Sequence, residues 1–393
     1  MTLQLFLVAG EPSGDRLGAA LMAGIKALTQ GPVSFHGIGG PLMQAEGLQT
    51  LFPMEELSVM GLTEILANYR RLARRVQQTA DAVVVMAPDA LITIDIPEFS
   101  LRVAEKVKQE APDLRTIHYV APTVWAWRPG RAKKMAKFVD HVLALLPFEP
   151  PYMEAAGMGC DFVGHPVVTE EQATEGEIAA FRAKHLADEG PVILVLPGSR
   201  RAEVERLMPV FGAALGDVLA RHPDARIVLP AAPAVAGIVA ARIKDWPGQP
   251  VMLDPRGVAP EDFAAEKRAA FTVADLALAA SGTVSLELAA TDTPMVVAYK
   301  MSWLSQKLIG ALLRVDTVTL VNLVTDSRTI PEFLSEHCRP APIAAAMNHL
   351  MEDERARADQ LDAMALTMRR LGRGGEAPWL RAARAVLAQI APD

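Results

Sequence analysis

The sequence predicts an α/β fold with two doubly wound, Rossmann-like domains that face each other across a cleft. Both halves of the 393-residue chain alternate short apolar runs with stretches of helical spacing, which is typical of parallel sheets covered by helices. A chain of this length exceeds one ordinary core, so two domains are expected. Glycine-containing turns follow several apolar runs, and open α/β sheets bind ligands at the edge where such turns lie.

The composition of the chain excludes several classes of partner and location. Apolar residues make up 51% of the chain and the formal net charge is −7, so nucleic acid is not an expected partner. The two cysteines are far apart, which favours a reducing compartment. The chain runs straight into a strand and has no apolar run of about 18 residues, so neither a signal peptide nor a membrane span is expected. No metal-like spacing of histidines or aspartates occurs, so we expect no metal and no cofactor.

The first strand is predicted at residues 3–9, and a helix at residues 17–28. The turn between them lacks the Gly-Lys-Ser/Thr of a P-loop, and residues 37–42 lack the last glycine of the dinucleotide fingerprint. A dinucleotide-dependent oxidoreductase is therefore not favoured.

Two carboxylates lie on that first turn. Glu11 and Asp15 are candidates for acid–base chemistry at a ligand-binding sheet edge, and Ser13 and Gly14 between them are candidates for contact with a ligand. The alternative is that Ser13 or Asp15 only caps the following helix.

Residues 60–76 predict an amphipathic helix with an arginine-rich end, which packs on the core or lies on an anionic membrane surface. Short strands are then predicted at residues 82–86, 91–94, 117–120 and 142–146. Asp95 ends the second of these runs, where Pro97 stiffens the loop. It is a candidate general base; the alternative is that it only accepts backbone hydrogen bonds.

An aromatic loop covers residues 121–128. Its Trp125, Trp127 and Arg128 either fill the core or form the wall of a substrate cleft. A polar, acidic stretch at residues 169–177 marks the domain boundary, so the N-terminal domain is expected to be residues 1–165 and the second domain residues 166–377.

The second half begins with a buried strand that ends at Pro197. Gly198 permits a tight turn, Ser199 is expected to cap the next helix, and Arg200 adds a cation beside its N-terminus. This turn is either a phosphate site or an ordinary strand–helix turn with a solvated arginine. The strands of this half are predicted at residues 192–196, 226–229, 250–253, 276–279 and 295–299.

A similar turn follows at Ser281, Gly282 and Thr283, whose amides and hydroxyls form a second anion cradle. Glu287, one helical turn later, is placed to accept the hydroxyls of a ribose, so the two turns together predict a nucleotide diphosphate site. Residues 301–314 carry Trp303, Leu304 and Leu308 at helical spacing with nearby cations, which indicates membrane contact or a core helix.

The ordered set of motifs resembles the lipid A disaccharide synthase family of Gram-negative bacteria. The set includes Ala-Gly-Glu-Pro-Ser-Gly-Asp at the first turn and Ser-Gly-Thr-Val-Ser-Leu-Glu at the second cradle. The matching segments are residues 9–15, 37–43, 59–62, 118–128, 146–149, 163–166, 196–200 and 281–287.

The resemblance implies a GT-B glycosyltransferase that transfers the sugar of UDP-2,3-diacylglucosamine to the 6-hydroxyl of 2,3-diacylglucosamine 1-phosphate. The products are a β-1,6 disaccharide phosphate and UDP, with inversion at the anomeric centre. It implies that Asp95 is the base, that Asn322 belongs to the donor site, and that the last helix, residues 378–393, crosses back to the first domain. It also implies a cytoplasmic protein attached peripherally to the inner membrane, and leaves a homodimer open.

Some positions depart from the family pattern. Glu98 and Ser100, after the candidate base, bear on acyl-chain or acceptor preference, and Ser335 bears on a donor contact.

Two alternative functions would use the same sequence features. One is an epimerase or hydrolase of UDP-sugars with this fold, and the other is a non-catalytic nucleotide or lipid binder.

Overall fold

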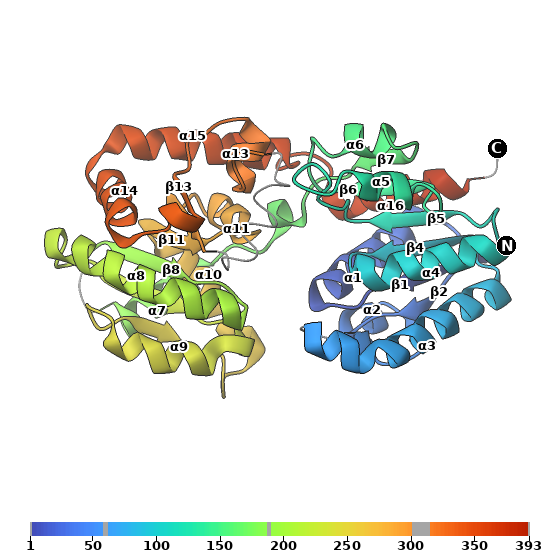
Figure 1. Cartoon of the computed structure of the whole chain (residues 1–393), viewed down its shortest axis with the longest axis horizontal. Helices are drawn as coiled ribbons and strands as arrows, with labels where there is room; N and C mark the ends of the chain where they lie inside the picture. Colours follow the sequence, from blue (N-terminus) through green and yellow to red (C-terminus); the bar gives the residue numbers. More distant parts are fainter. Residues whose placement is uncertain (1, 58–61, 187–189, 301–314, 392–393) are drawn as a thin grey trace. The chain divides into compact units, whose positions relative to one another are not determined.

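The computed structural model describes residues 2–57, 62–186, 190–300 and 315–391, and the chain divides into two compact units (Figure 1). Unit 1 comprises Met1–Thr169 and Leu371–Asp393, and unit 2 comprises Glu170–Arg370. From the sequence, the corresponding boundaries are expected after residues 165 and 377.

Unit 1 is built on a parallel sheet whose described part has seven strands in the order β3-β2-β1-β4-β5-β6-β7. These strands are β1 (Leu3–Val8), β2 (Val33–Ile38), β3 (Leu48–Thr50), β4 (Ala90–Ile94), β5 (Thr116–Tyr119), β6 (His141–Ala144) and β7 (Gly159–Phe162). The helical elements are α1 (Pro12–Leu28), α2 (Pro41–Ala45), η1 (Met54–Leu57), α3 (Leu62–Met86), α4 (Pro97–Glu110), α5 (Gly130–Met135), α6 (Pro150–Glu154), η2 (Pro166–Thr169) and α16 (Pro378–Ile390).

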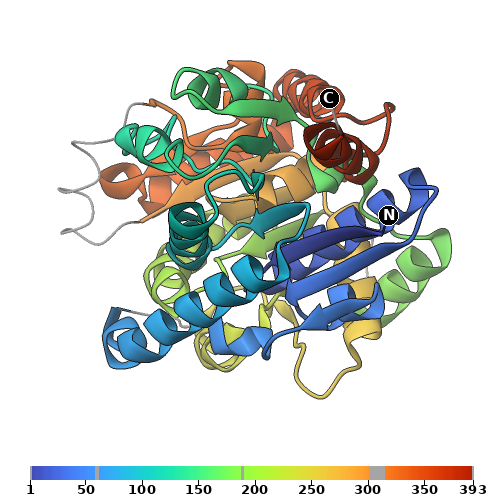
Figure 2. The same ribbon diagram turned by 90° about the vertical axis from the view of Figure 1, so that its right-hand side faces the viewer.

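Helices cover both faces of this sheet, so its central strands are buried on both sides, as parallel strands require. All five residues of β4 are buried. One face packs against α3, α4 and α5, and the other against α1 and α16. Figures 1 and 2 show α16, in dark red, beside the other elements of unit 1, although it ends the chain.

The contact between α1 and α16 depends on a glycine. A Cβ on Gly24 would lie only 2.8 Å from the Cβ of Ala383 and 2.9 Å from the carbonyl oxygen of Trp379. Small residues at both positions therefore let the two helix backbones approach closely, and Ala383 and Val386 enter the same core as β1.

One predicted strand is wrong. Residues 82–86 form the last turns of α3, which runs to Met86. Neither glycine nor proline occurs between Leu62 and Ala87, so nothing interrupts the helix until Ala87 takes a left-handed φ of +48° before Pro88. Val83 is buried while Val85 is 86% exposed, which is the periodicity of a helix with one packed face.

Unit 2 has a second parallel sheet, with six strands in its described part in the order β10-β9-β8-β11-β12-β13. They are β8 (Val192–Leu196), β9 (Arg226–Pro230), β10 (Val251–Leu253), β11 (Leu276–Ala280), β12 (Met295–Tyr299) and β13 (Glu332–Leu334). The helical elements are α7 (Glu175–His185), α8 (Arg201–Arg221), η3 (Pro233–Val235), α9 (Ala236–Arg242), η4 (Ile243–Asp245), α10 (Pro260–Val273), α11 (Val284–Ala290), α13 (Leu320–Thr325), η5 (Ser335–His337), α14 (Pro340–Glu352) and α15 (Glu354–Arg370).

The central strand pairs bring the candidate turns together within each unit. In unit 1, Val8 of β1 pairs with Thr93 of β4. In unit 2, Leu196 of β8 pairs with Ala279 of β11. Because paired parallel strands end at the same edge, the turns after β1 and β4 are neighbours in unit 1, and those after β8 and β11 are neighbours in unit 2. Both sheets thus have the Rossmann-like alternation that the sequence predicts.

Candidate active site

Asp95 follows β4 directly and lies in a strained loop of two residues. The φ angle is +51° at Asp95 and +37° at Ile96, left-handed values that are uncommon for non-glycine residues and more so for a β-branched one. Pro97 begins α4 immediately afterwards. The backbone N–H of Asp95 donates to the carbonyl oxygen of Tyr119 at 3.0 Å, so strand β5 holds the loop in place.

The carboxyl group of Asp95 is half-buried. Burial raises its pKa above the usual aspartate range, and a hydrogen bond from the backbone of Ile96 opposes that rise. A raised pKa makes the carboxylate a stronger base. This combination of exposure and basicity fits proton abstraction.

The turn after β1 packs against the Asp95 loop. A Cβ on Gly10 would collide with the side chain of Ile96, and one on Gly14 would lie 3.6 Å from the carbonyl oxygen of Ile94. Glu11 is exposed at the N-cap position of α1, and Ser13 is exposed in its first turn. Glu11 and Asp95 therefore lie on loops that touch, as the order of the strands predicts.

Asp15 has a different environment from Glu11. Its side chain is 3% exposed, and its Oδ1 accepts the N–H groups of Gly40 at 2.8 Å and Met43 at 3.0 Å. Its Oδ2 accepts the N–H of Leu42 at 3.0 Å. These are the orphan donors at the start of α2, so Asp15 caps a helix other than its own. This arrangement favours a structural function over a catalytic one.

Polar side chains lie beneath the Asp95 loop. Thr93 Oγ1 and His118 Nδ1 are 2.8 Å apart, and both residues are buried. Burial lowers the pKa of His118 to about 4, with a smaller contribution from Arg131, so the imidazole is neutral at neutral pH. Ser100, one of the positions that departs from the family pattern, is fully buried, and its Oγ has no hydrogen-bond partner within the described residues.

The aromatic loop divides into an inner and an outer part. Trp125 is 8% exposed, so it fills the core. Trp127 is half-buried and donates from Nε1 to Thr123 Oγ1 at 3.2 Å, and the guanidinium of exposed Arg128 lies 4.4 Å from the centre of its ring. Of the three predicted residues, Trp127 and Arg128 are therefore exposed enough for ligand contact, and Trp125 is not. For Trp125, the alternative that it fills the core is the one that its burial supports.

In unit 2, the turns after β8 and β11 are both open to solvent. Ser199 and Arg200 are exposed on the first turn, and Gly282 and Thr283 on the second. Each turn leads into a helix N-terminus, α8 or α11, and the dipole at a helix N-terminus favours an anion. The side chain of Arg200 is 77% exposed, and its Nη1 pairs with Glu203 Oε1 at 3.2 Å. A surface ion pair of this kind is weak, so a bound phosphate can compete with Glu203 for the guanidinium.

The expected N-cap at Ser199 is wrong by one residue. The N-cap of α8 is Arg200, whose backbone N–H donates to Glu203 Oε2 at 3.4 Å. A capping carboxylate belongs three residues after the cap, and Glu203 has that spacing only from Arg200. A Cβ on Gly198 would come within 2.7 Å of the same oxygen, so Glu203 packs closely against the turn and leaves no room for a side chain at position 198. Glu203 is not predicted from the sequence, although its spacing of three residues from Arg200 is that of a capping box.

Glu287 lies in the first turn of α11 and has a partner that the sequence did not reveal. Lys267 of α10 holds one of its carboxylate oxygens at 2.6 Å. The Glu287 side chain is 31% exposed, so the carboxylate can still accept a hydroxyl from a ligand.

Asn322 is buried rather than open to a ligand. Its Nδ2 donates to the carbonyl oxygen of Ile330 at 2.9 Å, and its Oδ1 accepts the N–H of Ile330 at 3.0 Å. Its exposure is 0%, so it stabilises the connection between α13 and β13 and has no open edge for the donor.

Trp303, Leu304 and Leu308, the predicted membrane contact, lie outside the described residues. Within the part of the chain that the structure describes, no helix is long and apolar enough to span a bilayer.

The chain matches known proteins over almost its whole length. The family model described as lipid-A-disaccharide synthetase matches residues 5–377. A lipid-A-disaccharide synthase of Ruegeria pomeroyi is 61% identical over 388 residues, covering 99% of this chain and 96% of that protein. One of Rhodospirillum centenum is 47% identical over 386 residues, covering 98% and 94%.

Solved structures share the fold at low identity. A putative UDP-N-acetylglucosamine 2-epimerase from Listeria monocytogenes has a TM-score of 0.64 at 12% identity, with 99% of this chain and 96% of that chain covered. A glycosyltransferase from Rickettsia africae has a TM-score of 0.60 at 13% identity, with 99% and 98% covered. These neighbours bear on the fold alone and assign it to the GT-B class. With the relatives described above, they show that the chain is a GT-B glycosyltransferase of the lipid-A-disaccharide synthase family.

Proposed function

We propose that the chain transfers the diacylglucosamine unit of UDP-2,3-diacylglucosamine to the 6-hydroxyl of 2,3-diacylglucosamine 1-phosphate. The observation that carries this proposal is Asp95, an accessible carboxylate of raised pKa on a strained loop at the carboxyl edge of the unit 1 sheet. An inverting transfer needs one base for the attacking hydroxyl, and no covalent intermediate on the protein. The products are the β-1,6 disaccharide phosphate and UDP.

In this proposal Asp95 takes the proton of the acceptor hydroxyl as that oxygen attacks the anomeric carbon. Glu11, on the touching loop, orients the acceptor with Ser13 and Gly14. Asp15 does not contact the reacting atoms, because its oxygens already accept the three N–H groups of α2. It holds the turn between β2 and α2 in place.

The donor is held by unit 2. Its diphosphate lies against the helix N-termini after Ser199 and after Thr283, and Arg200 pairs with it. The departing UDP gains negative charge as the glycosidic bond breaks, and fixed cations and amides stabilise such charge. Glu287, oriented by Lys267, accepts the ribose hydroxyls. Asn322 supports this region from the interior.

The acceptor is a sugar phosphate, so it needs a cation and a flat apolar surface. Arg128 and Trp127 provide this pair on an exposed stretch of unit 1. A guanidinium suits a phosphate because it donates two parallel hydrogen bonds.

A cationic segment beside this loop supports attachment to a membrane surface. Residues 128–137 contain five cations and no carboxylate, namely Arg128, Arg131, Lys133, Lys134 and Lys137. Lys133, Lys134 and Lys137 are exposed. Anionic lipids attract such clusters. We propose that the protein works at the cytoplasmic face of the inner membrane, where its acylated substrates lie.

The test is to incubate the purified chain with both lipid substrates and measure the UDP released and the disaccharide formed. Omitting the acceptor is the control. Release of UDP without acceptor would indicate the hydrolase alternative, and binding of UDP without turnover would indicate a non-catalytic binder.

A further inference from the structure

A buried carboxylate lies at the base of the aromatic loop. Glu149 is 3% exposed and is the N-cap residue of α6. Its Oε2 accepts the N–H of Leu146 at 3.0 Å, which closes the turn after β6. Its Oε1 accepts the indole N–H of Trp125 at 3.3 Å. One side chain thus joins the turn after β6 to the loop after β5.

Trp125 is also held through its ring. The centres of the Trp125 and Phe148 rings are 5.2 Å apart with an interplanar angle of 85°, the edge-to-face geometry that aromatic pairs prefer. Strands β5 and β6 are paired neighbours, with Tyr119 opposite Leu143. The contact therefore links two loops that leave the same sheet edge side by side.

The loop that Trp125 anchors has left-handed residues at both ends. The φ angle is +82° at Val120 and +50° at Arg128. Such conformations are unfavourable for non-glycine residues and persist only where surrounding contacts hold them. Trp125 is buried between them, together with Ala121 and Val124, while Trp127 is half-buried and Arg128 is exposed on the same loop.

Glu149 is a costly residue for this position if packing alone is its function. Burial raises its pKa to about 7, because the bonds from Leu146, Trp125 and Leu145 do not compensate fully for lost solvent. An apolar residue would fill the same space without this penalty. Glu149 does what an apolar side chain cannot do, which is to hold the indole N–H and the turn N–H together.

We propose that Glu149 is a positioning residue for the acceptor: by anchoring Trp125 it holds Trp127 and Arg128 in the geometry that takes a sugar phosphate. This rests on the proposed function, in which Trp127 and Arg128 bind the acceptor. Glu149 itself does not touch the substrate.

The test compares Glu149→Ala with Glu154→Gln, an exposed carboxylate of the same short helix. Glu149→Ala is expected to raise the acceptor KM and to lower the acceptor kcat/KM by roughly 10- to 100-fold, the scale of a substrate misplaced by about 1 Å. The Kd of UDP and the donor KM stay at wild-type values, because unit 2 is unchanged. Glu154→Gln is expected to match the wild type in every measurement.

A double-mutant cycle tests whether the effect passes through Trp125. In a Trp125→Phe background, which lacks the indole N–H, Glu149→Ala should cause little further loss. An equal loss in both backgrounds, or a wild-type acceptor KM in Glu149→Ala, overturns the proposal. If Glu149→Ala does not fold, Glu149→Gln replaces it, since its amide satisfies only one of the two N–H donors. A raised acceptor KM then supports the proposal, and a wild-type value overturns it. Failure of the wild-type chain to release UDP would instead contradict the proposed function.

Discussion

The carboxyl edges of the two sheets are built on the same plan but carry opposite chemistry. In unit 1 the turns after β1 and β4 carry carboxylates, and the loop of Asp95 is strained and half-buried. In unit 2 the turns after β8 and β11 are exposed, rich in glycine and hydroxyl groups, and lead into helix N-termini beside Arg200. The same edge of a doubly wound sheet can therefore carry either chemistry, and the residues of its turns decide which. Burial of an acid raises its basicity, whereas open amides attract an anion.

The largest effect is expected where the unit 1 edge performs chemistry. Asp95→Asn should lower kcat by roughly 100- to 10,000-fold, because the amide cannot take the proton of the acceptor. The Kd of UDP and the Tm should stay near wild-type values. Asp81→Asn, an exposed aspartate on α3, is the matched control. If Asp95→Asn turned over at the wild-type rate, Asp95 would not be the base and Glu11 would become the candidate.

The pH dependence of kcat/KM is a second test of Asp95 as the base. Because burial raises the pKa of Asp95, the acid limb of kcat/KM should lie at higher pH than the usual aspartate range. Activity is lost as pH falls through that raised pKa, since the base becomes protonated. An acid limb in the ordinary aspartate range would contradict this explanation.

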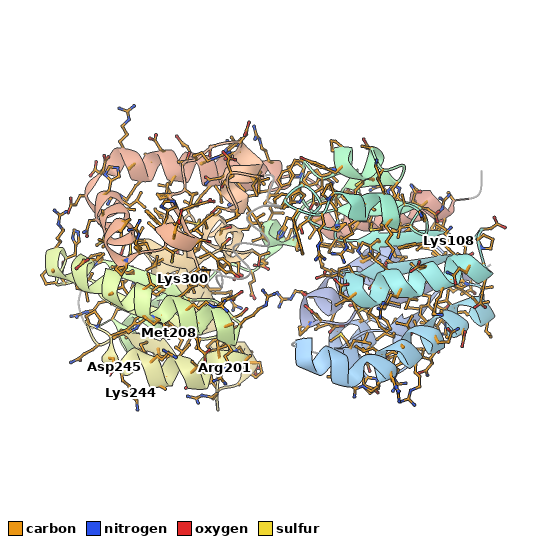
Figure 3. All side chains as sticks on the ribbon, viewed as in Figure 1. Lys108, Arg201, Met208, Lys244, Asp245 and Lys300 are labelled. Atoms are coloured by element: carbon orange, nitrogen blue, oxygen red, sulfur yellow. The ribbon has the colours of Figure 1, made fainter. Side chains whose placement is uncertain are left out.

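The next effect concerns the unit 2 edge. Arg200→Ala should lower kcat by roughly 100- to 1000-fold through the loss of one electrostatic donor to the leaving group. Stability should change little, since the side chain is 77% exposed and loses only a surface ion pair with Glu203. Arg201→Ala, one residue later at the start of α8 (Figure 3), is the control and should stay active, because Arg201 pairs with Glu205 on the surface of the same helix. Equal rates in the two variants would make Arg200 an ordinary solvated residue.

A smaller effect is expected at the membrane. Changing Lys133 and Lys134 together to Ser should weaken binding to anionic liposomes by roughly 30-fold, at about 1 kcal/mol per cation. The loss should disappear at high salt, where charge is screened. Lys244→Ser, an exposed lysine of unit 2 labelled in Figure 3, is the control in co-sedimentation. Equal sedimentation of both variants would show that residues 128–137 do not contribute to membrane binding.

Within unit 1, substitution of Asp15 should reduce stability, whereas substitution of Asp95 should reduce activity. Asp15→Ala leaves buried N–H groups of α2 unpaired and should lower the free energy of unfolding by about 1–3 kcal/mol. Asp113→Ala, an exposed loop aspartate, should leave stability unchanged in the same denaturant titration. A stable but inactive Asp15→Ala would restore Asp15 as a catalytic candidate.

The smallest expected effect is that of chelation. If Arg200 and the two helix N-termini stabilise the departing UDP, excess EDTA should leave the rate of UDP release unchanged. A loss of rate that magnesium restores would show that the unit 2 edge depends on a cation that the sequence did not predict.

The sequence by itself determined the features that depend on local order. Apolar runs predicted β1, β4, β8 and β11, because a buried parallel strand needs no partner information to be apolar on both faces. The turns after them carried Glu11, Asp95, Arg200 and the second anion cradle, since these residues follow strands directly in the chain. The ordered motifs identified the family.

The tertiary structure alone decided which of these side chains are available. Asp15 is occupied by N–H groups 25 to 28 residues later, Lys267 reaches Glu287 across 20 residues, and Glu149 holds Trp125 across 24. None of these pairs has a spacing that a helix or a turn imposes, so no pattern in the sequence reveals them. The strands β2, β3, β7 and β13 were missed for the same reason: polar residues or glycine interrupt their apolar runs, and pairing within the sheet makes them strands.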